Sequence, residues 1–200
     1  MPTRKGKREH DIGGRERLQA AALRLFAAKG YAATTVRDIL RAAGVTAPVL
    51  YYHFGNKEGL FLALAREGLG KLNAALGAAA GQTGTAADRV RAFCRAATAV
   101  RQEFEDLAGV VEAVLSGPPK GAPRLNVRSI FANMMRRLTE LISAGVETGE
   151  FRPCDPEPVA LALLGAVEMV ARLRLRGLST VRLADQLEGM MSVILAGLTP

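Results

Sequence analysis

Apolar residues recur along most of the chain with the spacing of an α-helix. The first clear segment ends at Lys29-Gly30, a basic last turn followed by the stop that helix C-termini prefer. Its apolar residues fall at positions i, i+3, i+4, i+7 and i+8, which is one helix face: Leu18, Ala21, Ala22, Leu25 and Phe26. The pattern therefore predicts an amphipathic helix near the start of the chain.

Two short helices are predicted next. Thr35 with Asp38 three residues later resembles a capping box, which indicates a helix that ends near Ala43-Gly44. Thr46 is a suitable N-cap for the following helix, and Pro48 would lie in its first turn, where a missing N–H costs no hydrogen bond. That helix ends by residues 54–55.

The remainder of the chain is also predicted to be helical. Asn56 is the expected N-cap of a long helix, and a Gly/Thr/Ala-rich break follows at 77–86. Further helices are predicted at about 86–101, 103–115, 124–148, 157–176 and 180–197, with Gly117-Pro118-Pro119 as a strong break. No alternating β-branched segment indicates a strand, so the fold class is all-α with about nine helices.

Positive charge is concentrated at the N-terminal end. The 200 residues carry a formal net charge of +8, and residues 1–60 hold eleven Lys/Arg against five Asp/Glu, so that 11 − 5 = +6. Residues 61–200 contribute 16 − 14 = +2. Such an end favours a polyanionic partner, nucleic acid first and an anionic membrane second, although a solubilising surface would also explain it.

Candidate chemistry for catalysis is scarce. With two histidines and two cysteines, a zinc site of these ligands and a His-based triad are nearly excluded, and we expect no metal and no cofactor. No nucleotide loop or nucleophile–base pair is evident, so we do not expect an enzyme. Cys94 and Cys154 suit free thiols in the cytoplasm. The apolar run 159–167 is too short to span a bilayer, which takes roughly 20 residues, and no apolar leader follows the first Met.

The second and third helices, joined by a tight Ala-Gly-Val turn, are typical of a helix-turn-helix. Residues about 15–62 resemble the DNA-binding domain of the tetracycline-repressor (TetR) family of bacterial regulators. The resemblance depends on four pieces in order and at the family's spacing: LFAAKGY, TTVRDI, AAGV and LYYHFGNKE. It implies a basic arm at 1–11, a helix-turn-helix domain at 12–56, and a larger ligand and dimerisation domain at 57–200 whose connecting helix covers 57–75.

The resemblance also implies which residues contact DNA. These are Thr35, Arg37, Thr46, Ala47, Pro48, Tyr51, Tyr52, His53 and Lys57. Val49, Leu50 and Phe54 are expected in the core instead. Tyr51 could mainly pack, His53 could be structural, and the basic arm could be a solvated tail or reach an adjacent groove. No long Arg or Gln lies on the recognition helix, so selectivity is expected to depend on Arg37, methyl contacts and DNA shape.

A ligand pocket is implied among the central helices, at roughly 90–175. Its candidate lining residues are Phe93, Phe104, Glu112, Phe131, Met134, Met135, Glu168 and Arg172. Each apolar candidate could equally be plain core. Glu112 and Glu168 interrupt apolar helices, and either could meet a cationic ligand or simply face water. Arg172 could complement its helix dipole or meet an acidic ligand.

The helix at 157–176 is apolar on nearly all sides, which requires cover on both faces. With the helix at 180–197 it is expected to form a homodimer through a four-helix bundle. The resulting prediction is a ligand-responsive regulator, most often a repressor in this family, that binds a palindromic DNA operator as a dimer and is released by an unknown small molecule. The alternative is a helical interaction protein whose basic end binds an anionic membrane or a protein partner.

Overall fold

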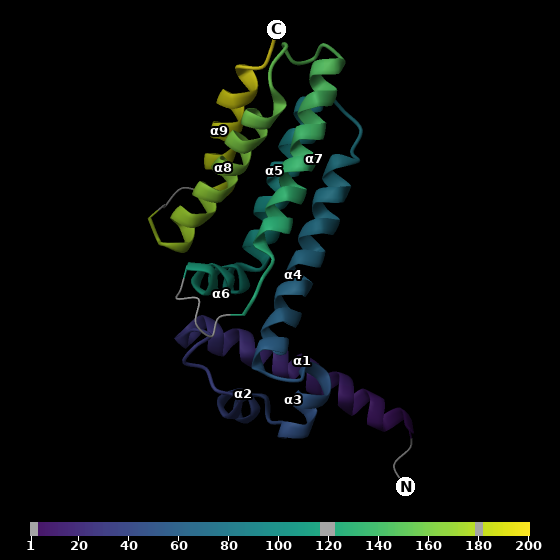
Figure 1. Cartoon of the computed structure of the whole chain (residues 1–200), viewed down its shortest axis with the longest axis vertical. Helices are drawn as coiled ribbons and strands as arrows, with labels where there is room; N and C mark the ends of the chain where they lie inside the picture. The colour runs from purple at the N-terminus through teal and green to yellow at the C-terminus, as the bar shows by residue number, and fades with distance from the viewer. Residues whose placement is uncertain (1–3, 117–122, 179–181) are drawn as a thin grey trace. The chain divides into compact units, whose positions relative to one another are not determined.

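The computed structural model describes residues 4–116, 123–178 and 182–200, which hold nine α-helices and no strand (Figure 1). The all-α prediction is confirmed, and the predicted break at 117–119 lies outside the described residues. In chain order the helices are α1 (Arg4–Lys29), α2 (Val36–Ala43), α3 (Ala47–Phe54), α4 (Lys57–Ala80), α5 (Ala86–Glu103), α6 (Glu105–Ser116), α7 (Val127–Glu147), α8 (Pro156–Leu175) and α9 (Leu183–Ala196).

The first helix begins earlier than the sequence pattern predicted. We expected a basic arm over residues 1–11, but α1 is helical from Arg4 onward. Residues 4–11 contain no proline to interrupt a helix, and they lack the apolar stripe that would have revealed one. The basic residues of this stretch therefore lie on a helix that is continuous with the helix-turn-helix.

The chain forms two compact units that are not contiguous in sequence. Unit 1 comprises residues 1–69 and 104–125, and unit 2 comprises residues 70–103 and 126–200. The expected boundary at residues 56–57 therefore differs from the observed one. Leu60, Phe61 and Leu64 in the first turns of α4 are buried in the core of unit 1, as are Leu107 and Val110 of α6.

Unit 1 is built around α1. Four residues of its predicted apolar stripe are buried and Leu25 is partly buried, and α2, α3 and α6 pack against this helix. Phe26, Tyr31 and Phe61 form a cluster of three aromatic rings with centroids 5.2–6.2 Å apart. This core supports the short helices α2 and α3, which could not be stable alone at eight residues each.

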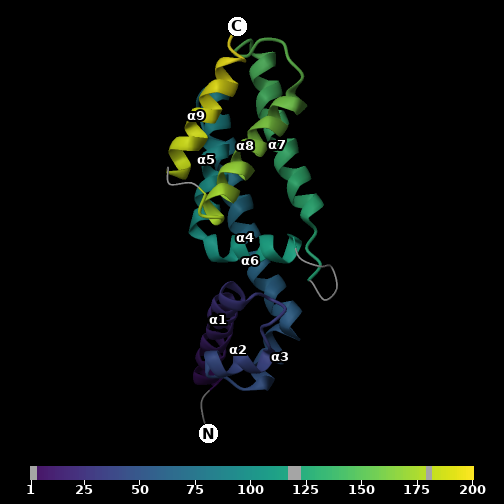
Figure 2. The same ribbon diagram turned by 90° about the vertical axis from the view of Figure 1, so that its left-hand side faces the viewer.

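Unit 2 consists of α5, α7, α8 and α9 with the second half of α4 (Figure 2). The end of α7 packs tightly on the start of α5, because a Cβ on Gly145 would lie 2.8 Å from Ala86 Cβ, and the Phe151 ring of the following loop packs on the same glycine. The carboxylate of Glu150 accepts hydrogen bonds from the backbone N–H groups of Ala86 and Ala87, which have no intrahelical partner. No helix within the described ranges is long and apolar enough to cross a bilayer.

Candidate nucleic-acid interface

The turn between α2 and α3 has the geometry of a helix-turn-helix. The predicted capping box is present, because the Asp38 N–H donates to Thr35 Oγ1 and the Thr35 N–H donates to Asp38 Oδ2, each at 3.1 Å. Asp38 also accepts from Lys29 Nζ at 2.7 Å. Hydrogen bonds from Lys29 and Thr35 hold the pKa of Asp38 well below its ordinary value. Gly44 ends α2 at φ 61°, a left-handed conformation that glycine adopts without strain.

The helix α3 is anchored from behind and open in front. Leu50 is fully buried, and the half-buried Val49 packs against α1, where a Cβ on Gly14 would lie 3.1 Å from Val49 Cγ1. Thr46 occupies the N-cap position, as predicted, but its side chain makes no capping hydrogen bond. The apolar back of α3 therefore fixes this helix on unit 1 and leaves the Thr46 hydroxyl at its exposed tip.

Two tyrosines dominate the exposed side of α3. Tyr52 is 75% exposed and Tyr51 is 55% exposed, more than a residue that mainly packs would be. Thr46 and Pro48 are exposed with them, as are Thr35 and Arg37 at the start of α2. The Thr35 oxygen accepts a capping hydrogen bond, and its O–H remains able to donate.

Ala47 and His53 are half-buried. The His53 ring packs in an edge contact on Tyr52, with centroids 4.9 Å apart, and lies 6.0 Å from the Phe54 ring. His53 therefore supports the exposed Tyr52 ring, whatever its own contact with DNA.

Lys57 makes internal contacts that the sequence did not predict. Its ammonium donates to the carbonyl oxygens of Tyr31 and Thr34, both at 2.9 Å, and lies 4.2 Å from the centre of the Tyr31 ring. Burial lowers the pKa of Lys57. These contacts tie the first turn of α4 to the α1–α2 loop, and the phosphate contact of Lys57 stays a prediction.

Sequence reasoning missed two residues that position the helices of this unit, one in the α1–α2 loop and one where α4 follows α3. Thr34 is completely buried, and its hydroxyl donates to the carbonyl oxygen of Gly30 at 2.8 Å. Gly59 allows α4 to start directly against the end of α3, because a Cβ there would lie 1.9 Å from the Phe54 carbonyl oxygen. The signal for Thr34 was its position beside the capping box, whereas the sequence held no signal for Gly59.

The predicted ligand-binding residues are divided between the two units. Phe104 and Glu112 belong to unit 1, whereas Phe93, Phe131, Met134, Met135, Glu168 and Arg172 belong to unit 2. Phe93 is completely buried in the core, and Phe131 is half exposed on α7. Met134 and Met135 are partly buried against the core of unit 2. Glu168 forms ion pairs with Arg101 and Arg172, and these pairs stabilise its negative charge on an otherwise apolar helix.

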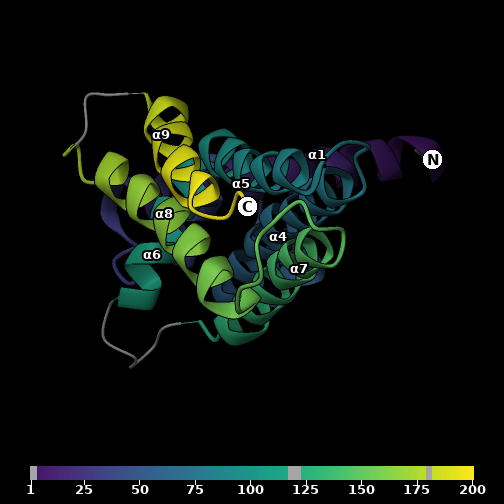
Figure 3. The same cartoon turned by 90° about the horizontal axis from the view of Figure 1, so that it is seen from above.

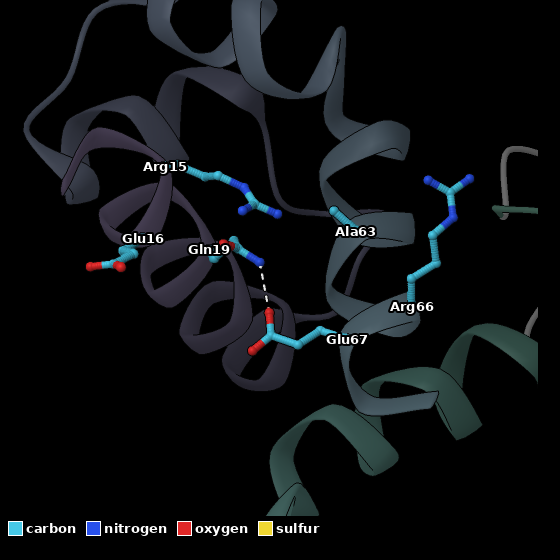
Figure 4. Close-up of a pocket in the computed structure, with 6 residues that line it drawn as sticks. All are labelled: Arg15, Glu16, Gln19, Ala63, Arg66 and Glu67. Atoms are coloured by element: carbon cyan, nitrogen blue, oxygen red, sulfur yellow. Dashed lines mark hydrogen bonds between the residues drawn. The ribbon is translucent and has the colours of Figure 1, made fainter. Parts of the chain in front are cut away.

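An open groove of about 570 Å³ lies between α1 and α4 within unit 1. Gln19 Nε2 donates to Glu67 at 3.1 Å on one side of it, and Arg15 extends from α1 toward the helix that carries Ala63, while Arg66 points away (Figure 4). Five of its six lining residues are polar or charged, and none of the six was predicted for a ligand pocket.

The outer sides of α8 and α9 carry uncovered apolar residues. The two helices lie side by side in unit 2 (Figure 3). On α8, Leu161 and Met169 are each 53% exposed and are separated by the exposed Gly165, while Val193 on α9 is 76% exposed and Met190 is 40% exposed. The opposite side of α8 is buried, so this helix is apolar on both faces, as its sequence indicated.

Comparisons with known proteins agree with this arrangement. Residues 18–64 match the family model of bacterial regulatory proteins, tetR family, and residues 83–192 match the model of the tetracyclin repressor-like C-terminal domain. The HTH-type transcriptional repressor AcnR of Corynebacterium efficiens is 45% identical over 56 residues, which are 28% of this chain and 30% of that protein. The chain thus matches less than a third of the length of that relative.

Two further relatives match over more of their length. The HTH-type transcriptional regulator BetI of Rhizobium meliloti is 29% identical over 81% of this chain and 76% of that protein. The crystal structure of the TetR family transcriptional regulator PfmR from Thermus thermophilus superimposes with a TM-score of 0.75 at 27% identity, over 92% of this chain and 100% of that one.

Proposed function

This chain belongs to the TetR family of bacterial regulatory proteins, and from that premise we propose that it represses transcription in the cytoplasm by binding a palindromic DNA operator as a homodimer. A small-molecule effector releases it. The observation that carries the proposal is the exposed side of α3. Tyr51, Tyr52 and Thr46 are exposed there, and the buried Leu50 anchors the opposite side of the helix.

The residues of this side divide into phosphate and base contacts. The hydroxyls of Tyr52, Tyr51 and Thr46 donate to phosphate oxygens or base edges, and Thr35 and Arg37 hold the backbone or a groove edge beside them. Ala47, Pro48 and the edge of His53 complete the surface, with apolar contacts to thymine methyl groups. Lys57 supports this surface indirectly, because its ammonium donates hydrogen bonds to carbonyl oxygens of the α1–α2 loop.

Dimerisation supplies the symmetry of the operator. The exposed apolar residues of α8 and α9 face the same helices of a second copy, which makes a four-helix bundle. A two-fold dimer presents two copies of α3 to half-sites about one helical turn apart, or roughly 10 base pairs. The operator should therefore be an inverted repeat.

Release follows from a difference in affinity. An effector that binds unit 2 better in the conformation that does not fit the operator shifts the population away from DNA, by no more than its differential affinity for the two states. The chain passes from one unit to the other within α4, and α6 of unit 1 lies in the sequence between α5 and α7 of unit 2.

The test is selection of bound sequences from a random DNA pool with the full-length protein. The proposal predicts enrichment of one inverted repeat, protected in a footprint with competitor DNA present. Uniform recovery of unrelated sequences, with no protected palindrome, would remove the repressor assignment.

A further inference from the structure

An Arg–Glu–Arg group joins α5 and α8 inside unit 2. Arg101 Nη1 donates to Glu168 Oε2 at 2.7 Å, and Arg172 Nε donates to Glu168 Oε1 at 2.8 Å. The second nitrogen of the Arg101 fork, Nη2, lies 3.5 Å from Glu168 Oε1. Two guanidinium groups therefore share one carboxylate. The side chains keep some access to solvent, being 27% exposed for Arg101, 41% for Glu168 and 46% for Arg172.

The Arg101 side chain is incompletely paired. In the part of the chain that the structure describes, its Nε is buried and has no hydrogen-bond partner. A buried N–H of a charged group is costly to leave without an acceptor. Nε together with one Nη is also the edge of the guanidinium fork that binds a carboxylate or phosphate through two parallel hydrogen bonds.

The charge balance at Glu168 agrees with this geometry. Burial raises the pKa of Glu168, but Arg101 and Arg172 lower it by more, so that its pKa lies below the ordinary value. The carboxylate thus remains ionised. An anion bound at Arg101 is the simplest species that would supply an acceptor for Nε.

Buried apolar residues lie next to the group on both helices. Ala97, one turn before Arg101 on α5, is buried, and so are Leu164 and Ala171, which flank Glu168 on α8. The helix α7 packs against both α5 and α8. It contributes the partly buried Met134 and Met135, whose flexible side chains can adjust to an inserted apolar group.

We propose that Arg101 is the docking group for an anionic effector, a carboxylate or phosphate head on an apolar body that inserts between α5, α7 and α8. The head binds Arg101 through Nε and one Nη, and Glu168 stays on Arg172. This inference rests on the proposed function, because it names the chemical class of the effector that the repressor would detect. In this proposal the Glu168 carboxylate competes with the effector's anionic head for Arg101, and it does not bind a cationic ligand.

The experiment is isothermal titration of the full-length protein without DNA, using four probes with the same ten-carbon chain below their micelle concentrations: decanoate, decyl phosphate, decanol and decyltrimethylammonium. Decanoate or decyl phosphate should bind, and the tighter of the two identifies the head group. Arg101→Gln should weaken that binding about tenfold or more. Glu168→Gln should leave it unchanged or strengthen it, because the competing carboxylate is gone.

Arg95→Gln is the matched control. Arg95 also shares a glutamate with a second arginine, since it and Arg91 both pair with Glu188, but this group lies on α5 and α9. Its removal should change anion affinity less than twofold. Thermal unfolding of each variant shows whether it folds. If Arg101→Gln does not fold, Glu168→Gln still tests the proposal, because it should bind the tighter anion at least as well as the wild type.

Three results would overturn the proposal: neither anion binds, decanol or the cation binds as tightly as the anions, or Arg101→Gln binds like the wild type. Operator release is measured separately, by adding the tighter anion to the protein–DNA complex. Binding at Arg101 without operator release would preserve the site and contradict the effector part of the proposed function.

Discussion

The Lys57 ammonium lies 2.9 Å from the carbonyl oxygen of Tyr31 and 4.2 Å from the centre of the same residue's ring. One side chain from the first turn of α4 thereby binds the loop that positions α2. Because the α1–α2 loop leads directly into the capping box at Thr35, this contact connects the long helix shared by both units to the helix-turn-helix.

Replacing Lys57 with Met should lower the free energy of unfolding by about 1–3 kcal/mol, because two half-buried carbonyl groups lose a charged donor. Urea denaturation measures this loss. Lys29→Met is the control: Lys29 is an exposed partner of Asp38, and its loss should cost about 1 kcal/mol or less.

The salt dependence of operator binding separates the two roles of Lys57. Each phosphate contact contributes about −0.9 to the slope of log K against log salt. An internal Lys57 predicts the same slope for wild type and Lys57→Met. A slope that becomes less negative by about one unit in Lys57→Met, with no loss of stability, would support the phosphate contact expected from the sequence.

Gly59→Ala should destabilise the protein by about 3 kcal/mol or more, since the new Cβ would lie 1.9 Å from a backbone oxygen that cannot move freely. Gly70→Ala, in the same helix, has nothing within 4 Å and should stabilise by about 0.5–1 kcal/mol. Chemical denaturation of both variants tests this contrast. Equal effects would show that α3 and α4 are not packed as described.

Tyr52→Phe removes one hydroxyl from a side chain that is 75% exposed. Stability should change by about 0.5 kcal/mol or less, while operator affinity should fall about tenfold if this hydroxyl donates to a phosphate. Fluorescence anisotropy with labelled operator gives the affinity. Unchanged affinity would exclude Tyr52 as a donor to DNA.

Val193→Asp should separate the dimer, because a carboxylate would be buried at the centre of the proposed α8–α9 bundle. Light scattering after gel filtration should show a monomer that retains its helical circular dichroism. Leu115→Asp is the control, an exposed apolar residue on α6, and should remain a dimer. A dimeric Val193→Asp variant would place the interface elsewhere.

Acidification should destabilise the α5–α9 contact through Glu188. Hydrogen bonding to Arg95, with the charges of Arg95 and Arg91, holds the pKa of Glu188 below its ordinary value of 4.5. A carboxylate with a depressed folded-state pKa stabilises the protein above the unfolded-state pKa, and this stability is lost as pH falls through the folded value. The melting temperature of Glu188→Gln should therefore fall less than that of the wild type below about pH 4.5. A variant of the exposed Glu147 should follow the wild type.

Local features of the DNA-binding unit could be predicted from the sequence because the residues involved are neighbours in the chain. Thr35 and Asp38 are three residues apart, so their capping box was evident, and the spacing of Leu18 to Phe26 marked one buried helix face. The burial of Leu50 was predicted because the second helix of a helix-turn-helix needs an apolar back, and Val49 and Leu50 are suited to it.

Features that depend on distant pairing could not be predicted. Lys57 lies 26 residues from Tyr31, and Arg101 lies 67 residues from Glu168, and no periodicity shows which of several arginines meets which acid. The burial of Leu107 in unit 1 was hidden for the same reason, because an amphipathic helix shows that it has an inner face but not which core covers that face.

The most direct test of the central claim is the ratio of two dissociation constants, measured at physiological salt for the operator selected from the random pool and for a scrambled duplex of equal length. A dimer that reads DNA with the exposed side of α3 predicts a ratio of at least about 10³ in favour of the operator. This ratio should collapse toward unity in Val193→Asp. Equal affinity of the wild type for both duplexes would contradict the account.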